Sequence, residues 1–229
     1  MESNVLYLIW KDPISRRNFS VGKLEKKESF LFSYLEEAEL AKKHGWEYLK
    51  SFPENKLYKS DKMFQIFSSR LPDKKRRDID AILRKYQLDE YDEFELLKQS
   101  GARLPIDNYE FIVPILEENG SMDISFSVMG VRYYIGCKGK DCKLARNVNV
   151  DEKLKLIPEP DNKYDANAVM IKNKENELLG YVPRYYSEKI FKQLKKNIKY
   201  SCKVIEKKMD GSCSECIQVR LLMPDNNAE

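Results

Sequence analysis

The pattern of the chain changes at residue 120, and this change limits the folds that the chain can adopt. Before it, helix-like periodicity alternates with strands; after it, short runs rich in β-branched and aromatic residues follow one another between turn residues. The strand-like runs are Ile124–Val131, Leu154–Pro158, Ala168–Lys172, Leu178–Val182, Cys202–Lys207 and Cys216–Leu222. One helix is expected among them, Tyr186–Leu194, which opens after Pro183 with Ser187 near its start. The C-terminal part is therefore predicted to be β-rich.

The first half of the chain predicts a mixed lobe. The expected strands are Val5–Trp10, Phe19–Leu24, Phe30–Tyr34 and Asp107–Pro114. The expected helices are Leu35–Leu49, Asp61–Phe67 with Ser60 as a cap, the segment from Pro72-Asp73 through Tyr86, and Asp92–Gly101, which Gly101 ends. Glu117–Gly120 is a polar, turn-forming stretch, so we expect two domains, at 1–116 and 121–229, and an α+β fold.

Composition favours a cytoplasmic protein. The 229 residues are 42% hydrophobic and 34% charged, which suits ordinary solvated domains. No run approaches the ~18 apolar residues that span a bilayer. Met1–Asn4 has neither the basic start nor the long apolar core of a signal peptide.

Cysteine usage leaves one metal question open. The five cysteines are Cys137, Cys142, Cys202, Cys213 and Cys216, and an odd number at wide spacing argues against a secreted disulfide framework. Cys213 and Cys216 have the spacing of a zinc knuckle, and Cys137 with Cys142 could complete four ligands. Reduced cysteines on hairpins are the favoured interpretation, so no metal and no other cofactor is expected.

Positive charge concentrates in the C-terminal part. Residues 1–120 carry 21 Lys and Arg against 22 Asp and Glu, a net charge of −1. Residues 121–210 carry 19 against 12, a net charge of +7, and residues 211–229 carry 1 against 3. A phosphate-binding surface would require such an excess, although lysine-rich surfaces are also common without one.

Three blocks of sequence in the C-terminal part identify a family. They are Gly130-Val131-Arg132-Tyr133-Tyr134, then Pro160–Ala168 (Pro-Asp-Asn-Lys-Tyr-Asp-Ala-Asn-Ala), then Leu179-Gly180-Tyr181-Val182-Pro183-Arg184. Their order and spacing over about residues 122–210 resemble a HIRAN domain, a small β-rich module of Swi/Snf-type DNA remodelling enzymes and of some stand-alone bacterial proteins. The resemblance implies a small OB-like β-barrel with one or two short helices. It also implies binding of single-stranded DNA at a free 3′ end.

The resemblance also implies roles for individual residues. Arg132 and Arg184 would hold phosphates, Tyr133 and Tyr164 would stack on the terminal base, and Asp165 would accept a hydrogen bond from the 3′ hydroxyl. Asn162 would orient that end, and Tyr134 and Tyr181 belong to the same nucleic-acid-binding set. Because Tyr133 and Tyr134 are adjacent on an expected strand, only one of them could line the pocket.

Simpler interpretations of the same residues stand beside this one. Asp161–Asp165 could be an ordinary turn, because Asp and Asn bond their own backbone, and Tyr133 or Tyr164 could be a core aromatic. Known members also place a late aromatic residue where this chain has Ser214-Glu215-Cys216-Ile217. That difference would weaken the hold on the penultimate nucleotide or shift its sequence preference.

The N-terminal half resembles another family more loosely. Phe30–Tyr34, Phe52-Pro53 and Ser60–Pro72 are similar to the N-terminal subdomain of HipA-type toxin kinases. The catalytic core of such kinases is absent, since there is no Gly-rich phosphate loop and no His-Arg-Asp or Asp-Phe-Gly analogue. This lobe would then be a non-catalytic regulatory module.

Catalysis is not expected. His44 is the only histidine, and no nucleophile motif accompanies it. The leading hypothesis is a bacterial protein that binds single-stranded DNA at its 3′ end in DNA repair, processing or defence. The alternative is an antitoxin-like protein-interaction module for a HipA-type kinase, in a toxin–antitoxin system. A metal-dependent nuclease is the third option.

Overall fold

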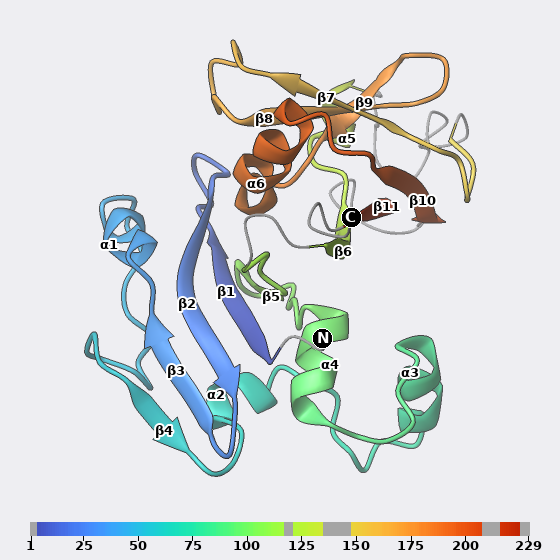
Figure 1. Ribbon diagram of the computed structural model, residues 1–229. Coiled ribbons are helices and arrows are strands. Elements are labelled where there is room, and N and C mark those ends of the chain that lie inside the picture. Colours follow the sequence, from blue (N-terminus) through green and yellow to red (C-terminus); the bar gives the residue numbers. More distant parts are fainter. Residues whose placement is uncertain (1–3, 117–120, 135–147, 208–215, 225–229) are drawn as a thin grey trace. The chain divides into compact units, whose positions relative to one another are not determined.

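The computed structural model describes residues 4–116, 121–134, 148–207 and 216–224 (Figure 1). The chain divides into two compact units, an N-terminal unit of Met1–Pro114 and a C-terminal unit of Ile115–Glu229. The N-terminal unit combines one sheet with four helices among its described residues, and the C-terminal unit is richer in strands. The mixed α+β class expected from the sequence is confirmed.

One antiparallel sheet organises the N-terminal unit. Its strand order is β4-β3-β2-β1-β5. The strands are β1 (Val5–Lys11), β2 (Asn18–Lys26), β3 (Phe30–Tyr34), β4 (Tyr58–Ser60) and β5 (Tyr109–Ile112). All of them except β4 follow the expected strand positions.

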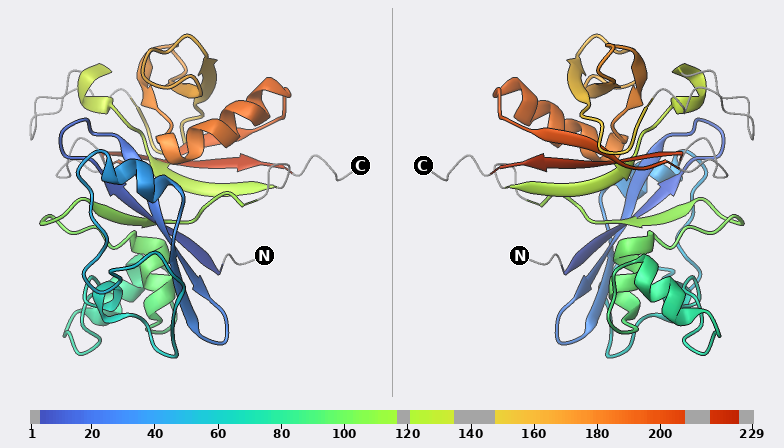
Figure 2. Two further views of the ribbon diagram at one scale, coloured as in Figure 1. Left: turned by 90° about the vertical axis from the view of Figure 1, so that its left-hand side faces the viewer. Right: turned by 90° about the vertical axis from the view of Figure 1, so that its right-hand side faces the viewer.

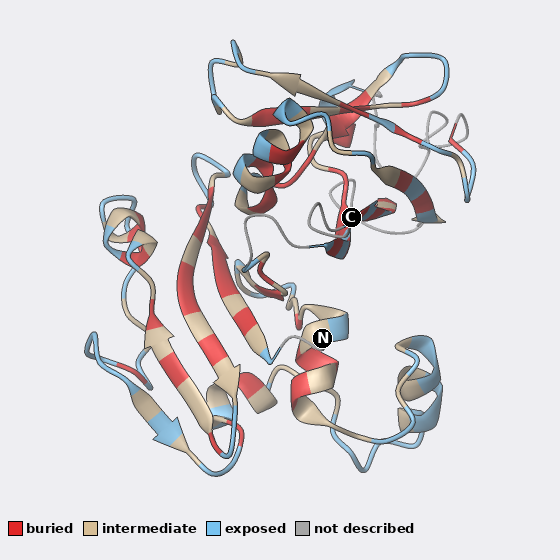
Figure 3. Cartoon of the chain, viewed as in Figure 1, coloured by how far each residue is buried: buried red, intermediate tan, exposed pale blue. Residues whose placement is uncertain are grey.

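Aromatic side chains fill the core of this unit. Phe32 on β3 is fully buried and stacks on Phe52 with ring centroids 4.5 Å apart. The rings of Phe67 and Phe32 make an edge-to-face contact with their centroids 5.2 Å apart. Buried residues recur along β1 and β2 in Figure 3, as expected for strands with one face on a core.

The helices α1 (Glu37–Lys42), α2 (Gln65–Ser68), α3 (Ile79–Lys85) and α4 (Glu93–Ser100) complete the N-terminal unit. Helix α4 was predicted almost residue for residue, because both of its ends are encoded locally. The Asp92 side chain accepts hydrogen bonds from the backbone of Phe94 and Glu95, and Gly101 ends the helix at a φ of 67°.

The other three helices are shorter than predicted. The expected helix Leu35–Leu49 stops at Lys42, because Gly45 adopts a φ of +87° and the chain turns there. The helix expected over Asp61–Phe67 begins only at Gln65. Before it, the Ser60 hydroxyl donates to the carbonyl of Lys62 and accepts from its N–H, which favours a turn.

The segment after Pro72 also differs from the helix predicted there. Asp73 accepts a hydrogen bond from the Lys75 backbone at 2.7 Å, so a turn takes the place of the predicted first helical turns. Helix α3 starts at Ile79, and the basic run 74–77 lies exposed before it.

The described residues of the C-terminal unit form two three-stranded antiparallel sheets. Their orders are β10-β11-β6 and β7-β8-β9. The strands are β6 (Met122–Ser127), β7 (Lys155–Glu159), β8 (Ala168–Lys172), β9 (Leu178–Tyr181), β10 (Ser201–Lys207) and β11 (Ile217–Met223). All six strand-like runs of the sequence are present, with ends displaced by one or two residues and β6 ending earlier than expected.

Two isolated bridges join these sheets at both edges. Met129, just after β6, pairs with Tyr181 of β9, and Lys153, just before β7, pairs with Lys203 of β10. Met129 and Tyr181 exchange both backbone hydrogen bonds at 2.8 Å. The pairings therefore link all six strands into a ring, the connectivity of a small barrel.

Helix α6 (Arg184–Lys195) packs against β7 and β8 (Figure 2). It is longer than the predicted Tyr186–Leu194, and its buried face includes Tyr186 and Ile190. The Tyr186 ring lies 5.9 Å from that of Phe126 on β6, so the helix contacts both sheets. No helix in the described parts of the chain has the length and apolar character needed to cross a bilayer.

The Arg70–Asp107 ion pair predicts that the stability of the N-terminal unit depends on pH. Burial alone would raise the pKa of Asp107, but hydrogen bonds from Arg70 and the Tyr109 backbone lower it overall. Because the pKa of Asp107 is lower in the folded state than in the unfolded state, the ionised carboxylate stabilises the fold at pH values above the unfolded pKa of about 3.9. This stabilisation is lost as the pH falls through the folded-state pKa. Replacing Arg70 by Met should lower the unfolding free energy by about 2–3 kcal/mol at pH 7 and flatten this acid dependence.

Urea unfolding followed by tryptophan fluorescence measures this effect, because both tryptophans, Trp10 and Trp46, are buried in the N-terminal unit. Arg76→Met is the matched control, since Arg76 pairs with Asp78 on the exposed surface. That variant should leave the unfolding free energy nearly unchanged, because a solvent-exposed ion pair contributes little to stability. Equal acid dependence in wild type and Arg70→Met would contradict the assignment.

Gly180→Ala should destabilise the C-terminal unit. A Cβ at this position would lie 2.2 Å from the Met129 carbonyl oxygen, and the φ of +153° is one that residues with side chains rarely adopt. We expect a loss of about 2–4 kcal/mol of unfolding free energy, measured by circular dichroism in urea.

Gly45→Ala separates backbone strain from the clash. Gly45 also has a positive φ, but a Cβ there would meet nothing within 4 Å. Its substitution should cost only about 1–2 kcal/mol. A Gly180→Ala variant as stable as wild type would show that Met129 and Tyr181 can separate without cost.

Candidate nucleic-acid interface

The first predicted block does not continue a strand, as the sequence suggested, but forms a short helix. Gly130 takes a φ of +79°, and α5 (Val131–Tyr134) follows it, with Val131 buried. Because neighbours on a helix differ by about 100° in direction, Tyr133 and Tyr134 need not face opposite sides. Arg132 is exposed, Tyr133 is 82% exposed and Tyr134 is 48% exposed.

The Met129–Tyr181 pairing brings the first and third blocks together. Helix α5 packs against β9, and the rings of Tyr134 and Tyr181 lie 5.4 Å apart at an angle of 55°. The Tyr181 hydroxyl donates a 2.9 Å hydrogen bond to Glu159 Oε2. Burial, together with this bond and the nearby Tyr134, raises the pKa of Tyr181, so it stays a neutral donor at physiological pH.

Glu159 connects the third block to the second. Its Oε2 atom also accepts a 2.6 Å hydrogen bond from the Asn162 side-chain amide. With its amide nitrogen held in this way, Asn162 directs its Oδ1 atom to the backbone N–H groups of Tyr164 (3.0 Å) and Asp165 (3.2 Å). One carboxylate therefore fixes the conformation of the loop that carries Tyr164 and Asp165.

Asp165 links this loop to the start of α6. Its Oδ1 accepts from the Asn167 backbone at 2.9 Å, and its Oδ2 accepts from the Ser187 hydroxyl at 2.8 Å. The same Ser187 hydroxyl lies 2.9 Å from the carbonyl of Arg184. Arg184 is the first residue of α6, and its side chain is exposed.

Tyr164 is 80% exposed on a loop whose backbone is held in place. Lys163 Nζ lies 5.9 Å from the centre of its ring. The interpretation of Tyr133 or Tyr164 as a core aromatic is excluded by this exposure. An exposed ring on an ordered loop is suited to stack on an unpaired base.

Hydrogen bonds and ring contacts thus connect six of the eight predicted residues. The connected set is Tyr134, Tyr181, Asn162, Tyr164, Asp165 and Arg184. Arg132 and Tyr133 share the short helix of Tyr134. The group offers cations, aromatic faces and carboxylate acceptors, the chemistry needed to bind an unpaired nucleotide.

Sequence reasoning missed two members of this network, Glu159 and Ser187. Glu159 lies just beyond the predicted run Leu154–Pro158, and its partner Tyr181 is 22 residues away. Ser187 was read only as a helix-start residue, and its bond to Asp165 also spans 22 residues. Their local sequences carry no signal for these bonds, because each bond joins segments that only the fold brings together.

The zinc hypothesis falls mostly on Cys137, Cys142 and Cys213, which lie outside the described residues. The cysteines that are described, Cys202 and Cys216, are both buried, and burial raises the pKa of the Cys202 thiol to about 12. Within the described ranges, no group of three or more His, Cys, Asp or Glu side chains is placed to hold a metal ion.

Comparison with known families agrees with this geometry. Residues 121–221 match the HIRAN domain family. Among solved structures, the chain is similar to the HIRAN domain of human HLTF, with 19% identity over 45% of this chain and 78% of that one and a TM-score of 0.35. A protein from Lactobacillus plantarum shows 18% identity over 45% of this chain and 97% of that one, with a TM-score of 0.36. No curated protein matches the chain.

The other half of the chain matches a different family. Residues 14–105 match the HipA N-terminal domain. The chain is thus similar to the HipA N-terminal domain over residues 14–105 and to the HIRAN domain over residues 121–221, and both resemblances predicted from the sequence are confirmed.

Glu159→Ala should loosen the loop of the HIRAN domain that carries Tyr164. Both the Tyr181 hydroxyl and the Asn162 amide would lose their acceptor, which should cost about 1–3 kcal/mol of unfolding free energy. The backbone amides of Tyr164 and Asp165 should exchange faster with solvent, and hydrogen exchange measured by NMR would detect this.

Glu177→Ala is the matched control for this experiment. Glu177 accepts a hydrogen bond from the Asn173 side chain at 2.8 Å, a similar carboxylate–amide pair in the turn between β8 and β9. That variant should leave the exchange of the Tyr164 and Asp165 amides unchanged. Unchanged exchange in Glu159→Ala as well would show that Glu159 does not hold the loop.

Proposed function

We propose that the HIRAN domain of this chain binds single-stranded DNA and recognises a free 3′-hydroxyl end. Tyr133, Tyr134, Tyr164 and Tyr181 would contact the terminal base or sugar, and Arg132 and Arg184 the phosphates. Asn162 and Asp165 would receive the terminal hydroxyl. The family match supports nucleic-acid binding, and the arrangement of the side chains supports recognition of an end.

The observation that carries this proposal is the exposed Tyr164 ring on a loop fixed by Asn162. A tyrosine left 80% exposed contributes little to a core. Its backbone is nevertheless ordered by a side-chain network that reaches across two strands of the sheet. Such pre-organisation lowers the entropy lost when a base stacks on the ring.

Asp165 supports recognition of a hydroxyl. A carboxylate repels phosphate groups, so its place beside a bound strand suits an end without a phosphate. Asn167 and Ser187 occupy one acceptor position on each of its oxygens. Each carboxylate oxygen has a further lone pair, so Asp165 could still accept a hydrogen bond from a 3′ hydroxyl.

The proposed activity is binding without catalysis. The chain would act as a sensor or recruiter of damaged or processed DNA, in repair, processing or defence. The N-terminal unit would then serve for contact with another component.

A second candidate function rests on the HipA N-terminal domain match at residues 14–105. This unit would bind a partner protein such as a HipA-type kinase and act as an antitoxin-like regulator, with the HIRAN domain as a scaffold. The two functions differ in their response to salt, because phosphate contacts make affinity fall steeply as the salt concentration rises.

Fluorescence anisotropy with a 5′-labelled single strand tests the proposed function. The strand should bind more tightly with a 3′ hydroxyl than with a 3′ phosphate. Tyr164→Ala should weaken binding of both strands by roughly 5- to 100-fold, because stacking is worth about 1–3 kcal/mol per base. Asp165→Ala should mainly remove the difference between the two ends.

Ser187→Ala is the control for Asp165. It removes one hydrogen bond of the Asp165 carboxylate but leaves its charge in place, so discrimination between the two ends should persist. Equal binding of both strands by the wild type would contradict recognition of an end. Absence of binding at low salt would favour the partner-protein function.

A further inference from the structure

Basic side chains lie directly opposite one another across several strands of the C-terminal unit. Lys155 of β7 pairs with Lys172 of β8, and Lys153 pairs with Lys203 of β10. Lys203 in turn pairs with Arg220 of β11. Since Lys153 and Lys155 are two residues apart, they share a face, and the five cations follow one another from β8 to β11. We call these five residues the cationic row.

Burial places the cationic row on the outside of the ring of strands. Lys153, Lys155, Lys203 and Arg220 are exposed, and Lys172 is half-buried. Their neighbours along each strand point to the core, and these are Leu154, Leu156, Ile171, Cys202, Val204, Val219 and Leu221. The row is therefore a surface feature that spans both sheets.

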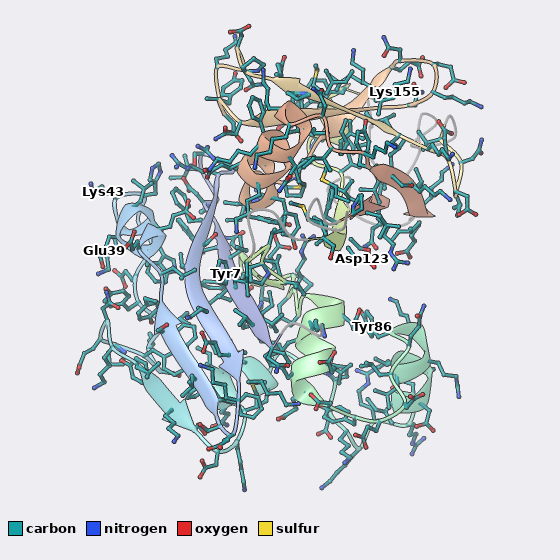
Figure 4. The ribbon with its side chains drawn as sticks, in the orientation of Figure 1. Tyr7, Glu39, Lys43, Tyr86, Asp123 and Lys155 are labelled. Atoms are coloured by element: carbon teal, nitrogen blue, oxygen red, sulfur yellow. The ribbon has the colours of Figure 1, made fainter. Side chains whose placement is uncertain are left out.

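Like charges directly opposite each other on neighbouring strands are destabilising. For most residues of the row, no described carboxylate offsets the positive charge. In the described part of the chain, Lys153, Lys155, Lys172 and Lys203 form no ion pair, whereas Arg220 makes a two-pronged pair with Asp123 at 2.6 and 2.7 Å. Asp123 and Lys155 are labelled in Figure 4. Two opposed pairs of lysines therefore repel each other, and a bound anion would relieve this repulsion.

The row shares the face of β7 that leads to the candidate end site. Lys155, Ile157 and Glu159 alternate along this strand, so their side chains point to the same side. Glu159 is the carboxylate that holds Tyr181 and Asn162. Four residues of strand separate Glu159 from Lys155, a distance of roughly 13 Å.

We propose that the cationic row binds the phosphate backbone of the nucleic-acid strand beyond the end that the candidate site holds. This inference rests on the proposed function, because it assigns a path to that same strand. A polyanion with evenly repeated charges fits a linear series of cations that crosses strands, and it would remove the repulsion between the opposed lysines. The end site would then set which end is bound, and the row would add affinity that grows with strand length.

The test compares short and long strands. A strand of about four nucleotides should fill the end site alone, and one of about sixteen should reach the row as well. The variant Lys155→Gln with Lys203→Gln removes one lysine from each opposed pair. It should bind the short strand as wild type does and the long strand about tenfold more weakly at low salt. The slope of log affinity against log salt for the long strand should fall by about 1.4, since each lost single-strand phosphate contact contributes about 0.7.

A double control removes the same charge elsewhere. Lys59 and Lys62 are exposed at and just beyond β4 of the N-terminal unit, and Lys59→Gln with Lys62→Gln should leave both affinities unchanged. The melting temperature of the row variant should equal or exceed that of wild type, because repulsion between opposed lysines is relieved. That result excludes misfolding as the cause of weaker binding.

The outcomes separate the row from the end site. If the short strand binds with a 3′-hydroxyl preference but lengthening adds no affinity, or the row variant equals wild type on the long strand, the row proposal is overturned and the proposed function stands. If a circular single strand binds with the row's salt slope while no end preference exists, the row stands and recognition of an end fails. If neither strand binds, both fail.

Discussion

The pairing of Met129 with Tyr181 is the interaction on which the C-terminal unit depends. It joins the edge of one three-stranded sheet to the edge of the other, and both of its hydrogen bonds are made by backbone groups. The close approach is open only to glycine at position 180, where a Cβ would overlap the Met129 carbonyl. The same contact places Tyr181 beside Tyr134 of α5, so closure of the ring of strands and assembly of the candidate site are one event.

Charge is divided between two parts of this domain. The candidate end site is organised by carboxylates, since Glu159 fixes the loop and Asp165 joins it to α6. The cationic row lies further along the same face of β7. A site that was basic throughout would attract phosphates everywhere and could not favour a hydroxyl end. On the proposed function, Asp165 would select the end, whereas Arg132, Arg184 and the cationic row would hold phosphates.

Local signals explain which parts of the fold could be predicted. Helix α4 carries its own boundaries in Asp92 and Gly101. Strand β8 was predicted with its exact ends from the short, mostly apolar run Ala168–Lys172. Helix α3 was predicted too long because the Asp73 side chain favours a turn. The short helix α5 was read as a strand, since nothing in Arg132–Tyr134 shows that Gly130 turns the chain before it. The blocks of the candidate site were found from sequence, whereas Glu159 and Ser187 make contacts with segments that are distant in the sequence.

The opposed lysines of the cationic row bear on function because their mutual repulsion destabilises the free protein. Residues chosen only for folding would place a carboxylate within reach of at least some of these lysines, as Asp123 is for Arg220 diagonally across β6 and β11. A row that weakens the free protein and fits a polyanion has the signature of a binding surface, because functional sites commonly keep interactions that oppose stability. The net charge of +7 over residues 121–210 does not by itself indicate a binding surface, since scattered lysines would give the same total. The register of the strands does indicate one, because it places the positive charges directly opposite one another.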